Sequence, residues 1–176
     1  MGRELRMVPP NWNHPVVERA HGQGFQPMRD QRFEDAANEW KAAFLKWESG
    51  DKKLDADDPA DMQYWEYDGG PPDRAYYRPW RDEEATWYQV WETVSEGTPV
   101  TPPFATKEEL IEYLVANGDF WDQKRRKQKS EGRTVAMNCD PWTRKQAELF
   151  VNGPGWAPSF VIGSNGIPID GVEALS

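Results

Sequence analysis

WYQVWETVSEGTPVTPPFATKEEL, residues 87–110, is the stretch that decides the fold of this chain. Its aromatic and β-branched run, residues 87–94, predicts a half-buried strand, and residues 95–97 have the composition of a turn. Prolines then hold the backbone extended as far as Thr106, which begins a helix as its N-cap, with Glu109 three residues on. No nucleophile, base and orienting partner can be picked out of this stretch. It indicates a fold and carries no chemistry.

Local patterns predict further elements on both sides of it. Apolar residues spaced as on one helix face predict a helix from near Asp30 to Gly50. They are Phe33, Ala37, Trp40, Phe44 and Trp47. Residues 64–67 predict a short aromatic strand, residues 140–151 a helix begun by Asp140 and Pro141, and residues 159–169 a hairpin.

The expected domain organisation follows from these elements. Residues 1–29 are rich in Pro, Asn and Gly, which predicts an irregular N-terminal arm. Strands and helices then mix without a regular βαβ alternation, so residues 30–176 predict a compact single α+β domain with a small mixed or antiparallel sheet packed by about three helices. That domain includes a basic run at residues 124–133.

Composition indicates a folded protein of the cytoplasm. The hydrophobic fraction is 38%, but ten Trp, seven Phe and six Tyr concentrate it in large side chains that can build a core. The single cysteine, Cys139, excludes an internal disulfide framework, and no N-terminal apolar run resembles a signal peptide. No window approaches the roughly 18 apolar residues of a membrane span, so we expect no membrane association.

Charge is distributed unevenly along the chain. The formal net charge is -9, which disfavours nonspecific binding to nucleic acid. Residues 48–73 hold nine acidic and two basic side chains, and residues 82–112 hold eight acidic and one basic, so each segment has a net charge of -7. Residues 124–133 have the opposite sign, with six basic side chains against one acidic, a net charge of +5.

Five short segments carry a family resemblance. They are YQVWETVSEGTPVTPPFATKEELIEYL at 88–114, GWAPSFV at 155–161, VPPNW at 8–12, WEYDGGPPD at 65–73 and YYRP at 76–79. Together they resemble a set of small proteins encoded by bacteriophages and prophages. The resemblance implies a viral context and a location in the host cell, and it brings no catalytic motif with it. It also implies that residues 119–138 are a basic insertion peculiar to this chain, within the domain at 30–176.

Patterns for catalysis or metal binding are weak. Asp55, Asp57 and Glu66 match positions one, three and twelve of a calcium loop. Pro59 and Ala60, however, stand where that loop needs an oxygen ligand and a glycine. GxSxG and HExxH motifs are absent, and clustered carboxylates usually face solvent. We therefore expect no catalytic residue, no metal site and no cofactor.

The charge pattern favours a protein that acts by binding. Carboxylates along a rigid surface can compete with phosphates for the Lys and Arg side chains of a nucleic-acid-binding protein. We therefore predict an acidic-surface inhibitor of a host defence protein or complex, with a host protein as partner and direct nucleic-acid binding disfavoured. The expected partner-binding residues are Glu83, Glu84, Glu92, Glu96, Asp55, Asp57, Asp58, Lys124, Arg125, Arg126 and Lys127.

Three alternatives stay open. A small-ligand or nucleotide-binding protein would stack its ligand on aromatic rings and hold phosphates with arginines. Its expected residues are Trp87, Trp91, Arg74, Arg78 and Arg81. An enzyme would use clustered carboxylates such as Glu92 and Glu96, with or without a divalent metal. A virion structural component would copurify with particles.

Overall fold

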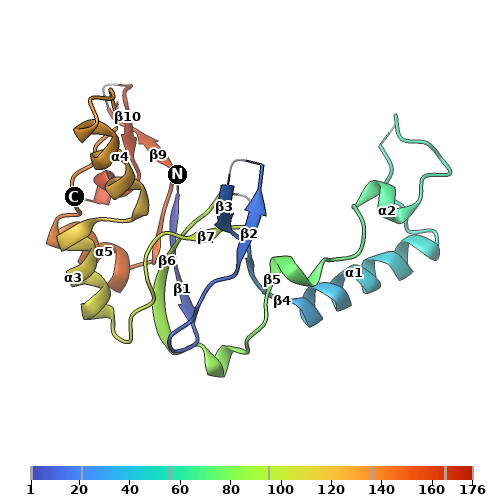
Figure 1. Cartoon of the computed structure of the whole chain (residues 1–176). Helices are drawn as coiled ribbons and strands as arrows, with labels where there is room; N and C mark the ends of the chain where they lie inside the picture. The colour runs from blue at the N-terminus through green and yellow to red at the C-terminus, as the bar shows by residue number, and fades with distance from the viewer. Residues whose placement is uncertain are drawn as a thin grey trace. The chain divides into compact units, whose positions relative to one another are not determined.

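The computed structural model describes residues 2–20, 22–55, 57–94, 96–135, 137–164 and 166–175. The chain combines helices with small, mostly antiparallel sheets, which confirms the predicted α+β class (Figure 1). Two compact units are present: unit 1 comprises residues 1–27 and 80–176, and unit 2 comprises residues 28–79. The boundary predicted near residue 29 is therefore wrong, because residues 1–27 belong to the same unit as residues 80–176.

Unit 1 is built on a four-stranded antiparallel sheet with the strand order β7-β6-β1-β8. Its strands are β1 (Arg3–Val8), β6 (Trp87–Glu92), β7 (Thr98–Pro99) and β8 (Trp156–Ala157). Strand β6 confirms the strand predicted from the aromatic run. It pairs along its whole length with β1, from Arg3 opposite Glu92 to Val8 opposite Trp87.

The N-terminal residues form a central strand and a hairpin, and this corrects the predicted irregular arm. Strand β1 was missed because half of its residues are charged, a composition that disfavours a buried strand. Arg3 and Arg6 are nevertheless buried. Arg3 pairs with Asp119, and the guanidinium of Arg6 lies 4.5 Å from the ring centroid of Trp91. These partners come from distant parts of the sequence, so local composition cannot reveal them.

Helices α3 (Lys107–Asn117), α4 (Phe120–Ser130) and α5 (Arg144–Asn152) gather on one side of this sheet (Figure 1). The predicted cap of α3 is confirmed, since the Thr106 hydroxyl accepts from Glu109 N and the Glu109 carboxylate accepts from Thr106 N. The N-cap of α5 is Thr143 rather than the predicted Asp140. The helix starts later because the Trp142 backbone N–H donates to the carbonyl of Leu114, which ties this segment to α3 first.

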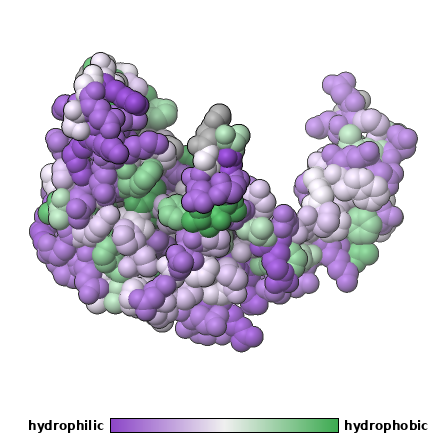
Figure 2. All heavy atoms as spheres, in the orientation of Figure 1, coloured by the Kyte–Doolittle hydropathy of each residue, from purple (hydrophilic) through white to green (hydrophobic). Residues whose placement is uncertain are grey.

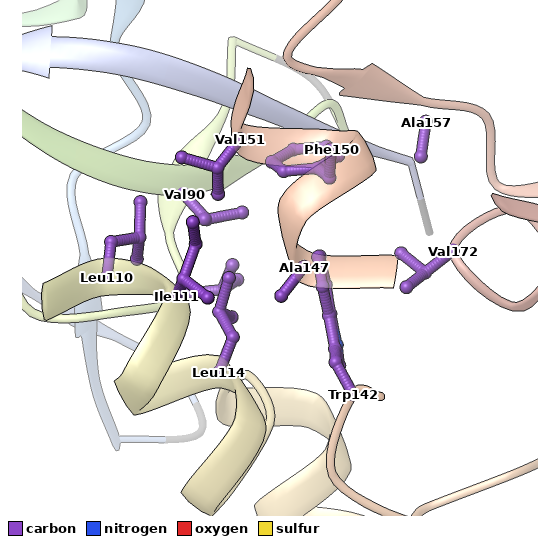
Figure 3. Close-up of a cluster of buried hydrophobic side chains, with 11 residues drawn as sticks. Val90, Leu110, Ile111, Leu114, Trp142, Ala147, Phe150, Val151, Ala157 and Val172 are labelled. Atoms are coloured by element: carbon purple, nitrogen blue, oxygen red, sulfur yellow. The ribbon is translucent and has the colours of Figure 1, made fainter. Parts of the chain in front are cut away.

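The hydrophobic core of unit 1 lies between α3, α5 and the sheet (Figure 3). The indole of Trp142 meets the ring of Phe150 edge to face, with 5.3 Å between centroids. Burial of one large apolar side chain in this core stabilises the folded state by about 1.5–3 kcal/mol of transfer free energy. The cluster comprises Val90, Val100, Leu110, Ile111, Leu114, Trp142, Ala147, Phe150, Val151, Ala157 and Val172.

Residues 119–138, predicted to be a basic insertion, are an integral part of unit 1. They contain α4, whose N-cap Asp119 is fully buried and bonded to β1. Two antiparallel hairpins complete the unit. The first pairs β2 (Val16–Arg19) with β3 (Gly22–Phe25). The second pairs β9 (Phe160–Ile162) with β10 (Pro168–Asp170), as predicted.

Unit 2 contains α1 (Phe33–Glu48), which confirms the helix predicted from apolar spacing, and a parallel pair of β4 (Arg29–Arg32) and β5 (Tyr77–Arg78). Residues 64–67 form the one-turn helix α2 (Tyr64–Tyr67) instead of the predicted strand. The turn places the buried Tyr64 ring against α1, with its centroid 5.4 Å from Trp40 and 5.7 Å from Trp47.

Candidate functional site

Unit 1 carries a hollow of about 470 Å³ bounded by the β2–β3 hairpin, by β6 and β7, and by the first turn of α4. A second hollow of about 290 Å³ adjoins it, because Phe25, Pro99, Val100 and Phe120 line both. We call the two together the hairpin groove. Hydrophobic surface is visible in Figure 2 where Figure 1 places β2, β3 and β7. The larger hollow is lined by Val16, Arg19, Gln23, Gly24, Phe25, Glu92, Thr98, Pro99, Val100, Phe120 and Trp121.

The hairpin supplies the first wall of this groove. Val16 and Phe25 lie directly opposite each other on β2 and β3, so their side chains share one face of the ribbon. Both stay open to solvent, with exposed fractions of 54% and 42%. At the foot of the hairpin, Gln26 N donates to the carbonyl of Pro15, and the Gln26 carbonyl accepts from His14 Nε2 at 2.6 Å. The wall is therefore anchored at its base.

His14 is held as a neutral imidazole. Its Nδ1 accepts a hydrogen bond from the indole N–H of Trp12, so that nitrogen carries no proton, and its Nε2 donates to Gln26. Burial lowers the pKa of His14 below its usual range, and the positive charge of Arg6 acts in the same direction. The ring also packs edge to face on Phe25 and Trp91. Both nitrogens are used in internal hydrogen bonds, one to Trp12 and one at the foot of the hairpin, which assigns His14 a structural role.

Glu92 provides the anionic group of the floor. This residue ends β6 and is half-buried. Its Oε1 accepts from the Thr98 hydroxyl at 2.6 Å, and its Oε2 accepts from the indole N–H of Trp121 at 2.8 Å. The two bonds fix the carboxylate between the floor and α4, and each oxygen keeps a lone pair for a further donor.

The first turn of α4 forms the opposite wall, and a buried ion pair sets its position. Arg3 Nε of β1 lies 2.5 Å from Asp119 Oδ2, while Asp119 Oδ1 caps the helix by accepting from the backbone N–H groups of Trp121 and Asp122. Phe120 N donates to the carbonyl of Val100 at 2.8 Å. These bonds hold Phe120 and Trp121 at the groove. Phe120 remains 49% exposed.

Two cations flank the groove. The Arg19 guanidinium, on the hairpin, donates to the carbonyl of Phe25 at 2.9 Å. The Lys124 ammonium, one turn into α4, lies 4.7 Å from the ring centroid of Trp121 and 5.7 Å from that of Phe120. The groove therefore combines exposed aromatic side chains, one oriented carboxylate, and a positive group on each wall.

The predicted acidic partner-binding residues are divided between the two units. Asp55, Asp57 and Asp58 lie in unit 2, where Asp58 accepts from the backbone N–H of Asp55. In unit 1, Glu83 and Glu84 are exposed on a short 3-10 helix (Asp82–Glu84). Glu96 is half-buried, and its carbonyl accepts from Arg6. Glu92 was expected on an outer face, and the structure corrects this by placing it in the groove, because Trp121 and Thr98 bind its carboxylate.

The predicted basic patch is reduced by internal bonds. Lys124 and Lys127 are exposed. Arg125 forms an ion pair with Asp122 at 2.5 Å. Arg126 donates to the carbonyls of Cys139 and Asn117. Two of the four side chains thus bond within α4 or tie it to the segments before and after it, which the sequence pattern could not show.

The residues predicted for the alternative ligand site are divided between the two units, and one of them is buried. Trp91 is fully buried beneath Arg6 and His14, so it cannot be a stacking platform, and Trp87 is half-buried. Arg81 is exposed in unit 1. Arg74 and Arg78 lie in unit 2, where they pair with Glu34 and Asp30 respectively. Period-two alternation assigns Trp91 to a face but does not say what covers that face.

The accessible aromatic residues of the groove were missed by sequence reasoning. Phe25 fell in the predicted arm, and Phe120 and Trp121 fell in the predicted insertion. Two local signals point to them in retrospect. Residues 16–25, VVERAHGQGF, have short apolar ends around a glycine-containing turn, which is typical of a hairpin. Asp119 is followed three residues later by Asp122, a capping pattern that starts a helix at Phe120.

Within the residues that the structure describes, no group of three or more His, Cys, Asp or Glu side chains is arranged to hold a metal ion. Nor does any helix in that part of the chain have the length and apolar character needed to cross a membrane. Comparisons with protein-family models, with curated proteins and with solved structures find no match to this chain.

Proposed function

We propose that this protein acts by binding, and that the hairpin groove takes a planar ligand with N–H donors and an anionic tail, the chemical class of nucleotides. The observation that carries the proposal is the oriented Glu92 carboxylate beside exposed aromatic rings. A hollow of about 470 Å³ lies within the size range of small-molecule sites, roughly 300–1,000 Å³. This keeps the nucleotide-binding alternative and moves its site from Trp87 and Trp91 to the groove.

Each part of the groove matches one part of such a ligand. The faces of Phe25 and Phe120 offer stacking surfaces, and stacking on an aromatic side chain contributes about 1–3 kcal/mol per base. The Glu92 oxygens accept N–H donors from a base edge. Arg19 and Lys124 stand where they can meet phosphate oxygens. Because the whole chain carries a charge of -9, attraction of the anionic tail depends on these two local cations.

Thermal unfolding with adenine and guanine mono-, di- and cyclic nucleotides tests the proposal. A ligand at about 100 times its Kd stabilises a protein by about 2.7 kcal/mol. For a chain of this size that corresponds to a rise in Tm of about 5–10 °C. We expect Phe120→Ala and Glu92→Gln to abolish the rise. Trp156→Ala is the matched control, because this exposed indole lines neither hollow.

Absence of a shift with every nucleotide, or an equal loss of the shift in Trp156→Ala and Phe120→Ala, would refute ligand binding in the groove. A shift that survives Glu92→Gln but not Phe120→Ala would refute the role of the carboxylate. Phe120→Ala, Glu92→Gln and Trp156→Ala are first compared with the unmodified chain by urea unfolding. This comparison distinguishes a loss of binding from a loss of folded protein.

The second candidate is the predicted acidic-surface inhibitor of a host nucleic-acid-binding protein, acting in the host cell. Exposed carboxylates on the short 3-10 helix (Asp82–Glu84) favour it, as does the cluster of Glu108, Glu112 and Glu148 around Arg144. Association with such a partner slows strongly as salt is raised, because the charges are screened. Capture of a basic host protein whose on-rate is independent of salt would contradict this mechanism.

A further inference from the structure

The β9–β10 ribbon is an exposed apolar surface whose residues are not among those lining the hairpin groove. Its two strands pair with each other and with no other strand of the described chain. The side chains of Phe160 and Ile162 on β9 are 57% and 61% exposed. An isolated two-stranded ribbon is marginally stable in water, and an uncovered strand edge is a template for a further strand.

The outward edge of β9 follows from the hydrogen-bond alternation. Gly163 N donates to the carbonyl of Ile167 at 3.0 Å, so these two residues form a hydrogen-bonded pair. Antiparallel pairs alternate, which makes Val161 and its partner on β10 the next hydrogen-bonded pair. The backbone N–H and C=O groups of Phe160 and Ile162 therefore point away from β10.

The outward edge of β10 is blocked by its own residues. By the same alternation its outward positions are Pro168 and Asp170. Pro168 has no N–H to donate, and Asp170 places a charge at the edge. Strand β9 is thus the edge that offers both donors and acceptors to another strand.

The distribution of charge on the chain indicates which partner can pair with that edge. Residues 158–169 contain no charged side chain, although the whole chain carries a charge of -9. A basic partner gains no attraction from an uncharged ribbon. Two copies of an acidic chain, by contrast, repel each other least where neither surface is charged. A second copy is therefore the partner that fits.

We propose that two copies of this chain associate through β9, antiparallel about a two-fold axis at Val161. The product is a four-stranded sheet, β10-β9 of one copy followed by β9-β10 of the other. Phe160 of each copy lies opposite Ile162 of the other, and each such pair exchanges two backbone hydrogen bonds. Their side chains fall on one face of the new sheet and form apolar cross-strand pairs. The interface is isologous, so it closes at two copies.

Sedimentation velocity from about 10 µM to about 1 mM tests the proposal, a range in which weak association is populated. We expect a concentration-dependent dimer whose dissociation constant rises at least about tenfold in Ile162→Lys. Ile167→Lys is the matched control, because Ile167 is 58% exposed on the opposite face of the same ribbon. A monomer throughout, open-ended aggregates, or equal effects of the two variants would overturn the proposal.

Cross-linking provides a second readout that does not depend on weakening the interface. Across the two-fold axis Val161 forms a non-hydrogen-bonded pair with its copy, at a Cα separation of about 4.5 Å that suits a disulfide. Oxidation of Val161→Cys should therefore give a covalent dimer, whereas Ile169→Cys, on β10, should stay monomeric. Equal cross-linking of both variants would contradict the register. Nucleotide binding is measured separately, so either proposal can fail without the other.

Discussion

Replacing Asp119 by Asn tests whether one buried ion pair holds the groove together. The side chains of Arg3 and Asp119 are 2% and 1% exposed. Asn caps a helix about as well as Asp, so the substitution removes the negative charge and keeps the cap of α4. Breaking a buried pair by removing one partner costs about 3–5 kcal/mol, because a charge is left buried without its counterpart. For a chain of this length the corresponding fall in Tm is about 6–20 °C.

The double variant Arg3→Met/Asp119→Asn distinguishes the interaction between these two side chains from the contacts that each makes with other residues. Replacing both charges by groups of similar size is often nearly neutral, so we expect the double variant to be more stable than Asp119→Asn alone. Urea unfolding of the unmodified chain, of Arg3→Met, of Asp119→Asn and of the double variant gives the coupling energy, which should be at least about 2 kcal/mol. Additive effects would refute the interpretation. Because the pair positions Phe120 and Trp121, Asp119→Asn should also weaken ligand binding in the hairpin groove.

Three further predictions concern pH, surface charge and the core. The pKa of His14 is lower in the folded state than in the unfolded state, so the neutral ring stabilises the fold fully above about pH 6.5, and this contribution is lost as the pH falls below that value. His14→Gln should therefore reduce the pH dependence of the free energy of unfolding measured between about pH 7 and 5. Arg144 forms ion pairs with three exposed glutamates and lowers the pKa of one of them, Glu112. Because salt screens such pairs, Arg144→Gln should lower Tm more in low salt than in about 1 M salt, with Lys145→Gln as the control. Leu114→Ala should cost about 2–5 kcal/mol in urea unfolding, against about 0.5 kcal/mol or less for the 45% exposed Leu149→Ala.

Local sequence signals were enough for several elements of this fold. The apolar spacing from Phe33 to Trp47 predicted α1, and the Thr106–Glu109 capping box predicted the start of α3. The turn between two apolar runs predicted the β9–β10 hairpin. Each of these signals lies within a few residues of the structure it specifies, because helix caps, helix faces and tight turns are stabilised by near neighbours.

The groove depended on contacts between distant residues. Its walls come from strands β2 and β3 and from Phe120 and Trp121, and its floor comes from Glu92 and residues 98–100. The charged residues of β1 could become a central strand only because Asp119, 116 residues away, neutralises Arg3. Burial of an ion is favourable only when its partner is in place, and the partner is brought there by the tertiary fold. The sequence by itself thus determined the α+β class, several of its elements and the acidic charge, while the tertiary structure decided which aromatic rings are buried and which line a site.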